Sequence, residues 1–261
     1  MTAEQVLQES KVEGLTVKLP PVQLDRKTYQ DVAKKLELIG GKWKGGKVAG
    51  FVFQQDPTDL LLKIANGEKR NLKKEFQFFG TPDRLADQLV ALAELINTDH
   101  VLEPSAGQGA IIKAIRRFNK NCYIDAFELM PLNCEILKSI NETALTPLRE
   151  DLLWFGYWQA DFLEQASFSR NIGKYNKIIA NPPFNKNQDI DHIKAMHDCL
   201  KKGGRLVSMA SKHWQFANNK KETDFREWLD EVNATVVDVP AGEFKESGTT
   251  IATCIIIIDK V

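Results

Sequence analysis

The motif with the clearest chemical meaning is Asn181-Pro182-Pro183-Phe184, which directly follows the largely apolar segment 174–180. This segment has the pattern of a buried β-strand, so the motif is expected at the carboxyl edge of a sheet, where open α/β folds bind ligands. The Asn181 side chain and the Pro182 carbonyl offer two acceptors, and the prolines stiffen the turn and remove competing backbone donors. The motif therefore predicts a site that orients a group with two N–H donors.

An amino group attached to an aromatic ring suits this arrangement. Its lone pair is delocalised into the ring, and two acceptors aimed at its hydrogens favour the tetrahedral, nucleophilic geometry. Phe184 offers a flat apolar face for a base withdrawn from its stack. Asn181, Pro182 and Phe184 are thus predicted to be catalytic residues for methylation of an exocyclic base amine. A Pro-Pro turn after a strand is also common without any catalytic role, so the prediction depends on a cofactor site beside it.

A second motif, EPSAGQG at residues 103–109, lies between a predicted strand and a predicted helix. Gly107 and Gly109 let the backbone approach a ligand, and the start of the helix offers unpaired amides. Glu103 ends the strand, and another acid, Glu128, ends the next one. A carboxylate there can accept hydrogen bonds from both ribose hydroxyls and would repel a 2′-phosphate. The pattern predicts a nucleoside cofactor; a dinucleotide such as NAD, or a merely solvated Glu128, are the alternatives.

A sheet must position these motifs, and from residue 76 onward predicted strands alternate with predicted helices. Such alternation is typical of a parallel sheet covered on both faces. The predicted strands are 99–103, 122–128, 157–160, 176–180, 204–210, 234–239 and 251–258. The last two are joined by a loop, so they are expected to pair antiparallel at the sheet edge. Seven strands with this ending resemble a Rossmann-like class I methyltransferase sheet, and the predicted fold class is α/β.

Residues 1–75 are predicted to form a small N-terminal α+β module, separate from the domain at 76–261. The first 20 or so residues lack a clear period and are expected to form an arm or an edge strand. The further expected elements are a helix at 26–39, a hairpin with Gly45-Gly46 as its turn and Val48 alternating in its second strand, and a short helix to about Ala65. Residues 66–75 have the composition of a linker.

Cationic side chains give this module a small basic excess, although the net charge of the whole chain is zero. The candidate DNA contacts are Lys42, Trp43, Lys44 and Lys47 in the hairpin, and Lys69, Arg70, Lys73 and Lys74 in the linker. Lysines on phosphates give affinity that is independent of base sequence. The alternative is a stabilising or oligomerisation module whose lysines are simply solvated.

The composition is that of a globular protein. The chain has 261 residues, of which 43% are hydrophobic and 27% charged. Its apolar runs are far shorter than the ~18 residues of a membrane helix, and it lacks a signal-peptide pattern, so no membrane is expected and the cytoplasm is the expected compartment. The four cysteines form no CxxC pair, and His192 and His197 lie five residues apart, so no metal is expected.

In their order along the chain, FQFFGTPDRLADQLVALA (76–93), EPSAGQG (103–109) and NPPF (181–184) resemble the gamma-type N6-adenine DNA methyltransferases. The resemblance covers roughly residues 76–261, and the whole chain is similar to orphan enzymes of phages and mobile elements. It implies S-adenosyl-L-methionine as the cofactor and double-stranded DNA as the partner. It also implies methyl transfer to the N6 amine of adenine after base flipping.

The resemblance implies individual roles as well. Thr81 would contact the methionine end of the cofactor, Asp161 would contact its adenine with Phe162 against the ring, and Phe244 would sandwich the flipped base. The implied cofactor-binding residues are Thr81, Glu103, Pro104, Ala106, Gly107, Gly109, Glu128, Asp161, Phe162 and Asn181. The large recognition domain that usually follows the final hairpin in this family is missing before Val261. A separate specificity partner or a homodimer is therefore expected to contribute.

Three other functions are left open by the sequence. An RNA methyltransferase acting on guanine N2 or adenine N6 would use the same amine geometry. A protein glutamine N-methyltransferase would likewise act on a weakly nucleophilic nitrogen, that of a side-chain amide. The non-enzymatic alternative is a DNA-binding or anti-restriction module with a degenerate catalytic fold. The intact NPPF motif and glycine turn argue against this last alternative.

Overall fold

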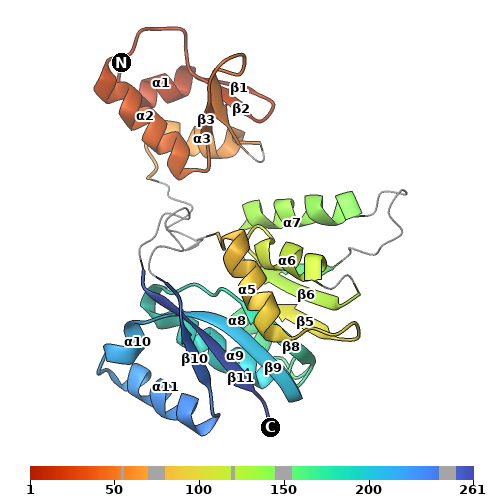
Figure 1. Cartoon of the computed structure of the whole chain (residues 1–261). Coiled ribbons are helices and arrows are strands. Elements are labelled where there is room, and N and C mark those ends of the chain that lie inside the picture. The colour runs from red at the N-terminus through yellow and green to blue at the C-terminus, as the bar shows by residue number, and fades with distance from the viewer. Residues whose placement is uncertain (54–55, 70–79, 119–120, 145–154, 241–250) are drawn as a thin grey trace. The chain divides into compact units, whose positions relative to one another are not determined.

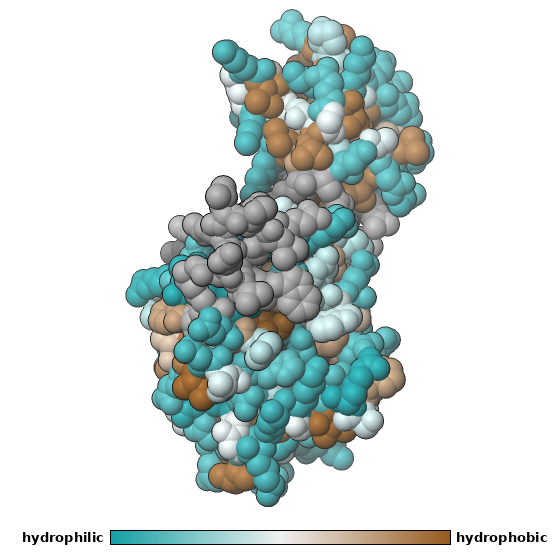
Figure 2. Space-filling view, turned by 90° about the vertical axis from the view of Figure 1, so that its right-hand side faces the viewer, coloured by the Kyte–Doolittle hydropathy of each residue, from teal (hydrophilic) through white to brown (hydrophobic). Residues whose placement is uncertain are grey.

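The computed structural model describes residues 1–53, 56–69, 80–118, 121–144, 155–240 and 251–261 (Figure 1). The chain divides into two compact units, Met1–Phe78 and Phe79–Val261, and each is described by itself. Where the surface is coloured in Figure 2, hydrophobic residues are interspersed with hydrophilic ones on both units. None of the described helices is both long and apolar enough to cross a membrane.

In its described residues, the N-terminal unit combines three helices with a four-stranded antiparallel sheet. The helices are α1 (Ala3–Glu9), α2 (Arg26–Leu38) and α3 (Thr58–Ala65), and the strands are β1 (Lys11–Glu13), β2 (Thr16–Lys18), β3 (Lys42–Lys44) and β4 (Gly50–Val52). The strand order is β1-β2-β4-β3, which leaves β3 at an edge. The predicted α+β character, the helix at 26–39 and the helix ending near Ala65 are confirmed.

The first 20 residues form a helix and a hairpin rather than an arm, and β1 lies at an edge of the sheet, which confirms the alternative expectation of an edge strand. The Thr2 side chain accepts a hydrogen bond from the Gln5 amide at 3.3 Å, and the Gln5 side chain accepts one from the Thr2 amide at 2.8 Å. This capping box stabilises the start of α1, whose Val6 and Leu7 are buried, and residues 11–18 continue as a hairpin. A helix of seven residues holds too few apolar positions to reveal its period in the sequence.

The second hairpin has a longer turn than predicted. Trp43 of β3 lies opposite Phe51 of β4, and the connection runs from Gly45 to Ala49. Val48, expected in the second strand, lies in this turn and is exposed. This longer turn includes two residues with positive φ angles, Gly46 at 67° and Ala49 at 41°.

The second unit is built on a seven-stranded sheet, as predicted. Its strands are β5 (His100–Glu103), β6 (Tyr123–Glu128), β7 (Gly156–Gln159), β8 (Tyr175–Ala180), β9 (Leu200–Ser211), β10 (Thr235–Asp238) and β11 (Thr253–Asp259). They lie in the order β10-β11-β9-β8-β5-β6-β7. β5 to β9 are parallel, whereas β11 is antiparallel to both β9 and β10. The α/β fold class and the antiparallel ending of the sheet are therefore confirmed.

Helices cover both faces of this sheet (Figure 1). The helices are α5 (Asp83–Ala93), α6 (Ala110–Phe118) and α7 (Pro131–Ala144) on one face, and α8 (Phe162–Ala166), α9 (Gln188–Cys199), α10 (His213–Phe216) and α11 (Lys220–Glu231) on the other. In β11, Ile255 packs with the first group, whereas Cys254, Ile256 and Ile258 pack with the second. A strand that is buried on both faces has a continuous apolar run in its sequence, which explains why β11 could be predicted from the sequence.

The carboxyl ends of the parallel strands bring the predicted motifs to one edge of the sheet. β5 ends at Glu103, β6 at Glu128 and β8 at Ala180, directly before Asn181. β5 lies between β6 and β8 in the sheet, so its glycine turn is flanked by the ends of the other two strands. This edge is where open α/β sheets bind ligands.

Candidate functional site

The glycine turn after β5 has the backbone conformation that glycine favours. Gly107 and Gly109 have φ angles of 53° and 74°, in the left-handed region. A β-carbon on Gly109 would lie 2.9 Å from Cδ1 of Ile140, so a side chain there is strained and crowded. The Ala106 amide donates to the Phe127 carbonyl at 2.9 Å and joins the turn to β6. Pro104 and Ala106 are buried within this turn.

Glu128 is held rigidly beside this turn. Its carboxylate accepts hydrogen bonds from the Gly107 and Met130 amides, both at 2.6 Å. Burial raises the pKa of Glu128, and these two hydrogen bonds and the nearby Asn133 amide act in the opposite direction. The sequence-based alternative of a merely solvated Glu128 is wrong, because the side chain is buried and hydrogen-bonded.

Glu103 lies at the end of the neighbouring strand and is 1% exposed. Burial, and then the charge of Glu128, raises the pKa of Glu103 well above its usual range. Its Oε2 atom has no hydrogen-bond partner among the described residues. Two buried acidic groups that repel each other suit a ligand that brings positive charge and hydroxyl donors.

Asn133, near the start of α7, was not identified from the sequence. It is 1% exposed and lies close enough to Glu128 to lower the pKa of that carboxyl, and its Oδ1 atom has no hydrogen-bond partner within the part of the chain that the structure describes. Buried polar atoms are rarely left unpaired in proteins. Asn133 is therefore an additional candidate ligand contact. Its only sequence signal is a polar residue early in a helix that follows a predicted cofactor strand.

The NPPF motif begins where β8 ends. The Asn181 Nδ2 atom donates to the Thr81 hydroxyl at 3.0 Å, across 100 residues of sequence. The Asn181 Oδ1 atom is buried and accepts no hydrogen bond from any described residue. The structure thus brings Thr81 and Asn181 together and holds the amide with its oxygen unpaired among the described residues.

Two of the three aromatic residues predicted to stack on ligands lie within the described chain, and both are more buried than expected. Phe184 is 8% exposed and belongs to the apolar cluster that includes Leu85, Val207 and Ile255. Phe162 is 3% exposed, with its ring centroid 6.0 Å from that of Phe127. In this conformation each ring contributes mainly to the core, and their contacts with a base or a cofactor stay predictions.

Asp161 lies at the end of β7 and starts α8. Its side chain accepts a hydrogen bond from the Leu163 amide at 2.8 Å, which caps this short helix. The neighbouring Ala160 amide donates to the Glu128 carbonyl at 3.1 Å, so Asp161 follows directly on a segment joined to the cofactor strand. Its predicted role toward the cofactor adenine is compatible with this position.

The other predicted contacts are placed only in part. Lys42, Trp43, Lys44 and Lys47 are exposed in the N-terminal unit, as is Lys69. Phe244, Arg70, Lys73 and Lys74 lie outside the described residues.

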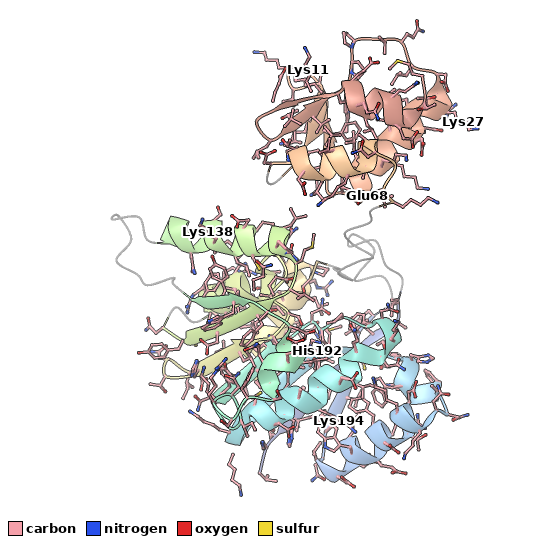
Figure 3. The ribbon with its side chains drawn as sticks, turned by 180° about the vertical axis from the view of Figure 1, so that it is seen from behind. Lys11, Lys27, Glu68, Lys138, His192 and Lys194 are labelled. Atoms are coloured by element: carbon pink, nitrogen blue, oxygen red, sulfur yellow. The ribbon has the colours of Figure 1, made fainter. Side chains whose placement is uncertain are left out.

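The two histidines on α9 have different surroundings. Figure 3 shows His192 beside α8, and its ring centroid lies 5.6 Å from that of Phe162. Burial lowers the pKa of His192 to about 4. Among the described residues, no group of three or more His, Cys, Asp and Glu side chains could hold a metal ion.

No protein-family model and no curated protein matches the chain. Among solved structures, a protein from Vibrio vulnificus YJ016 described as a modification subunit of a type I restriction enzyme matches with a TM-score of 0.57 and 15% identity, over 93% of this chain and 55% of that chain. The M protein of the type I restriction enzyme EcoKI matches with a TM-score of 0.56 and 16% identity, over 98% of this chain and 56% of that chain. The cyclase SpnF matches with a TM-score of 0.51 and 14% identity, over 68% of this chain and 80% of that chain.

These similarities show that the second unit has the Rossmann-like methyltransferase fold. The chain spans little more than half the length of each of the two restriction-enzyme proteins, and both matches cover too much of it to omit the N-terminal unit. A protein named as a cyclase shares the same fold, so the fold alone does not decide the reaction. The reaction must be argued from the site.

Proposed function

We propose that this protein transfers a methyl group from S-adenosyl-L-methionine to the N6 amine of adenine in DNA after base flipping. The proposal depends above all on the hydrogen bonding of the Asn181 side chain. Its Nδ2 atom is held by Thr81, while its buried Oδ1 atom accepts no hydrogen bond from any described residue. An acceptor fixed in this way, next to the Pro182 carbonyl, is suited to an amine with two hydrogens to donate.

The residues at the carboxyl edge fit the proposed cofactor. Glu128 would accept the ribose hydroxyls, and the unpaired oxygen atoms of Glu103 and Asn133 offer further polar contacts. When bound, S-adenosyl-L-methionine supplies a methyl group on a positively charged sulfur, and the two buried acids favour such a charge. Asn181 and Pro182 would orient the amine, and its proton can leave to solvent after transfer, so no strong base is needed.

The DNA adenine assignment is supported by two independent observations. The order of the TP, EPSAGQG and NPPF segments resembles gamma-type N6-adenine DNA methyltransferases. Two solved structures that match 98% and 93% of this chain are named as an M protein and as a modification subunit of type I restriction enzymes. One of them is described as a subunit, which favours a separate specificity partner for this chain as well.

We assign part of the DNA contact to the N-terminal unit. Specific DNA interfaces usually bury ~1,000 Å² or more of protein surface, and a single base pocket buries little. Lys42, Trp43 and Lys44 form the exposed edge strand β3, with Lys47 exposed in the turn that follows. Trp43 is 47% exposed, and its ring packs edge-on against Tyr29 and Phe51, which fixes its orientation.

The proposed function is tested by offering labelled S-adenosyl-L-methionine together with one substrate at a time. The substrates are duplex DNA, structured RNA and a release-factor protein. We expect label in DNA, recovered as N6-methyladenine after digestion to nucleosides. Label in RNA alone or in the protein alone would assign one of the alternative reactions. Absence of label from all three would contradict a methyltransferase function.

A further inference from the structure

The turn that follows the NPPF motif has an unusual backbone. Lys186 (φ 54°, ψ 29°) and Asn187 (φ 56°, ψ 38°) are consecutive non-glycine residues in the left-handed region. Asparagine tolerates this region better than most residues, whereas lysine has no such preference. Backbone of this kind persists only where the surrounding structure holds it, and it is concentrated at functional sites.

A buried carboxylate from a remote helix holds this turn. Glu222 of α11 is 1% exposed, and its Oε1 atom accepts a hydrogen bond from the Asn187 Nδ2 atom at 2.6 Å, across 35 residues of sequence. The Asn187 amide in turn donates to the Phe184 carbonyl at 3.2 Å. Glu222 is therefore connected through Asn187 to the last residue of the NPPF motif.

A second contact holds the start of α9 but leaves the turn itself to Glu222. The Asp189 Oδ2 atom accepts hydrogen bonds from the Ser211 amide at 2.8 Å and the Ser211 hydroxyl at 2.9 Å, which joins α9 to the end of β9. With the strand end at Ala180 and the helix start at Asp189 both anchored, the intervening backbone has few conformations left. The Glu222 contact acts on the two residues whose conformation is least favourable.

We propose that Glu222 is a positioning residue for the amine-binding site. Through Asn187 it sets the conformation of the turn, and so the direction in which the Asn181 side chain and the Pro182 carbonyl point. This inference rests on the proposed function.

Packing alone does not account for a carboxylate here. Its Oε1 atom also accepts a hydrogen bond from the Asn219 Nδ2 atom at 3.4 Å and lies 3.7 Å from the His213 Nε2 atom, while its Oε2 atom has no partner among the described residues. The hydrogen bond from Asn187, at 2.6 Å, is the shortest of these contacts and is of the charge-assisted kind, which is stronger and more directional than a neutral one. The turn is therefore the closest polar partner of Glu222.

The proposal predicts a specific kinetic pattern. Glu222→Ala should lower kcat roughly tenfold, because small displacements of orienting groups slow a reaction strongly. The dissociation constant of the cofactor should change little, since most of the residues expected to bind it lie at the carboxyl ends of β5, β6 and β7, whereas the turn follows β8. Glu222→Gln keeps an acceptor oxygen and should retain most of kcat. Glu227→Ala, at an exposed glutamate of the same helix, is the matched control.

A rescue variant separates positioning from general damage. Glycine adopts the left-handed conformation without strain, so adding Asn187→Gly to Glu222→Ala should restore part of kcat. Hydrogen exchange followed by mass spectrometry gives a readout independent of activity. Exchange in the segment 181–189 should be faster in Glu222→Ala than in Glu227→Ala. Asn187→Ala, which removes the donor, should reproduce both effects and serves if Glu222→Ala does not fold.

Equal kcat values for Glu222→Ala and Glu227→Ala would overturn the proposal. It would also be overturned if kcat fell while exchange in 181–189 stayed at the control rate, because Glu222 would then act by another route. A wild-type protein that methylates none of the three substrates would refute the proposed function instead. Exchange would still decide in that case whether Glu222 holds the turn.

Discussion

At the residue scale, the candidate site is marked by buried polar atoms that have no partner within the described chain. The Asn181 Oδ1 atom lies directly after β8, and the Glu103 Oε2 atom lies at the end of the adjacent strand β5. The Asn133 side chain lies beside Glu128. Unsatisfied buried groups destabilise a fold by about 1–3 kcal/mol each. Their concentration at one sheet edge is explained if bound molecules supply the missing partners.

Replacing Asn181 with Ala should remove the acceptor that we propose is used mainly in the transition state. Turnover should fall by ~10²-fold or more, while the dissociation constant of the cofactor changes little. Steady-state methylation assays and calorimetry measure the two quantities. Asn218→Ala, at an exposed asparagine outside the site, is the control and should keep full activity. Near-normal turnover in Asn181→Ala would refute the assigned role.

His192 should make the stability of the fold dependent on pH. Burial lowers its pKa from 6.5 to about 4 in the folded state, so the unfolded chain binds a proton that the folded chain does not. The free energy of unfolding is therefore unaffected by His192 above pH 6.5 and decreases as the pH falls from 6.5 toward 4. Between pH 7 and pH 5 the loss attributable to His192 is about 2 kcal/mol.

Urea unfolding at pH 7 and pH 5 measures this difference. The His192→Phe variant keeps a ring against Phe162 but cannot bind a proton, so its unfolding free energy should change less between the two pH values. An identical change in variant and wild type would show that His192 is not the group responsible.

At the element scale, the glycine turn depends on both backbone conformation and space. Gly109 and Gly173 both have positive φ angles, 74° and 61°. A β-carbon on Gly109 would lie 2.9 Å from Ile140 and 3.2 Å from Leu137, whereas one on Gly173 would meet nothing within 4 Å. The two positions thus differ in crowding but share the conformational requirement.

Substitution of each glycine by alanine separates these two effects. Both variants should lose about 1–2 kcal/mol of unfolding free energy from the left-handed conformation. Gly109→Ala should lose a further 1–3 kcal/mol, roughly the range for overpacking, because α7 must shift to admit the methyl group. Chemical denaturation measures both values. Equal losses in the two variants would mean that α7 adapts without strain.

At the scale of the whole molecule, the division into two units separates the proposed base capture from the proposed phosphate contacts. The second unit carries the sheet edge with Asn181 and Glu128, and the N-terminal unit carries the exposed lysines of β3. Contacts to phosphates depend on salt, whereas contacts within a base pocket depend on shape and hydrogen bonding. The two contributions can therefore be measured separately.

Changing Lys42, Lys44 and Lys47 together to Gln should weaken DNA binding and flatten its salt dependence. The slope of log affinity against log salt should fall by roughly 0.9 for each phosphate that the variant no longer neutralises. The matched control changes three exposed lysines elsewhere in the same unit, Lys11, Lys27 and Lys34, and should alter the slope less; two of them are labelled in Figure 3. Native affinity and slope in the first variant would show that this hairpin does not touch DNA.

The seven strands, the antiparallel ending of the sheet and the edge at which both motifs lie could be predicted from the sequence. Most of these strands contain apolar runs bounded by turn residues, and parallel strands place their carboxyl ends together, so local pattern was sufficient for them. It was insufficient for α1, whose seven residues are too few to show a period, and for Val48, because the φ angles of Gly46 and Ala49 lengthen the turn.

Which side chains meet at the candidate site depends on how the elements pack, and the sequence did not predict it. The Thr81 contact to Asn181 and the Glu222 contact to Asn187 join segments 100 and 35 residues apart, and the burial of Phe184 depends on helices and strands from across the unit. Periodicity reports whether a residue faces a core, because burial repeats with the geometry of its own helix or strand. Which remote group meets it there is set by how the elements pack, and no local pattern encodes that.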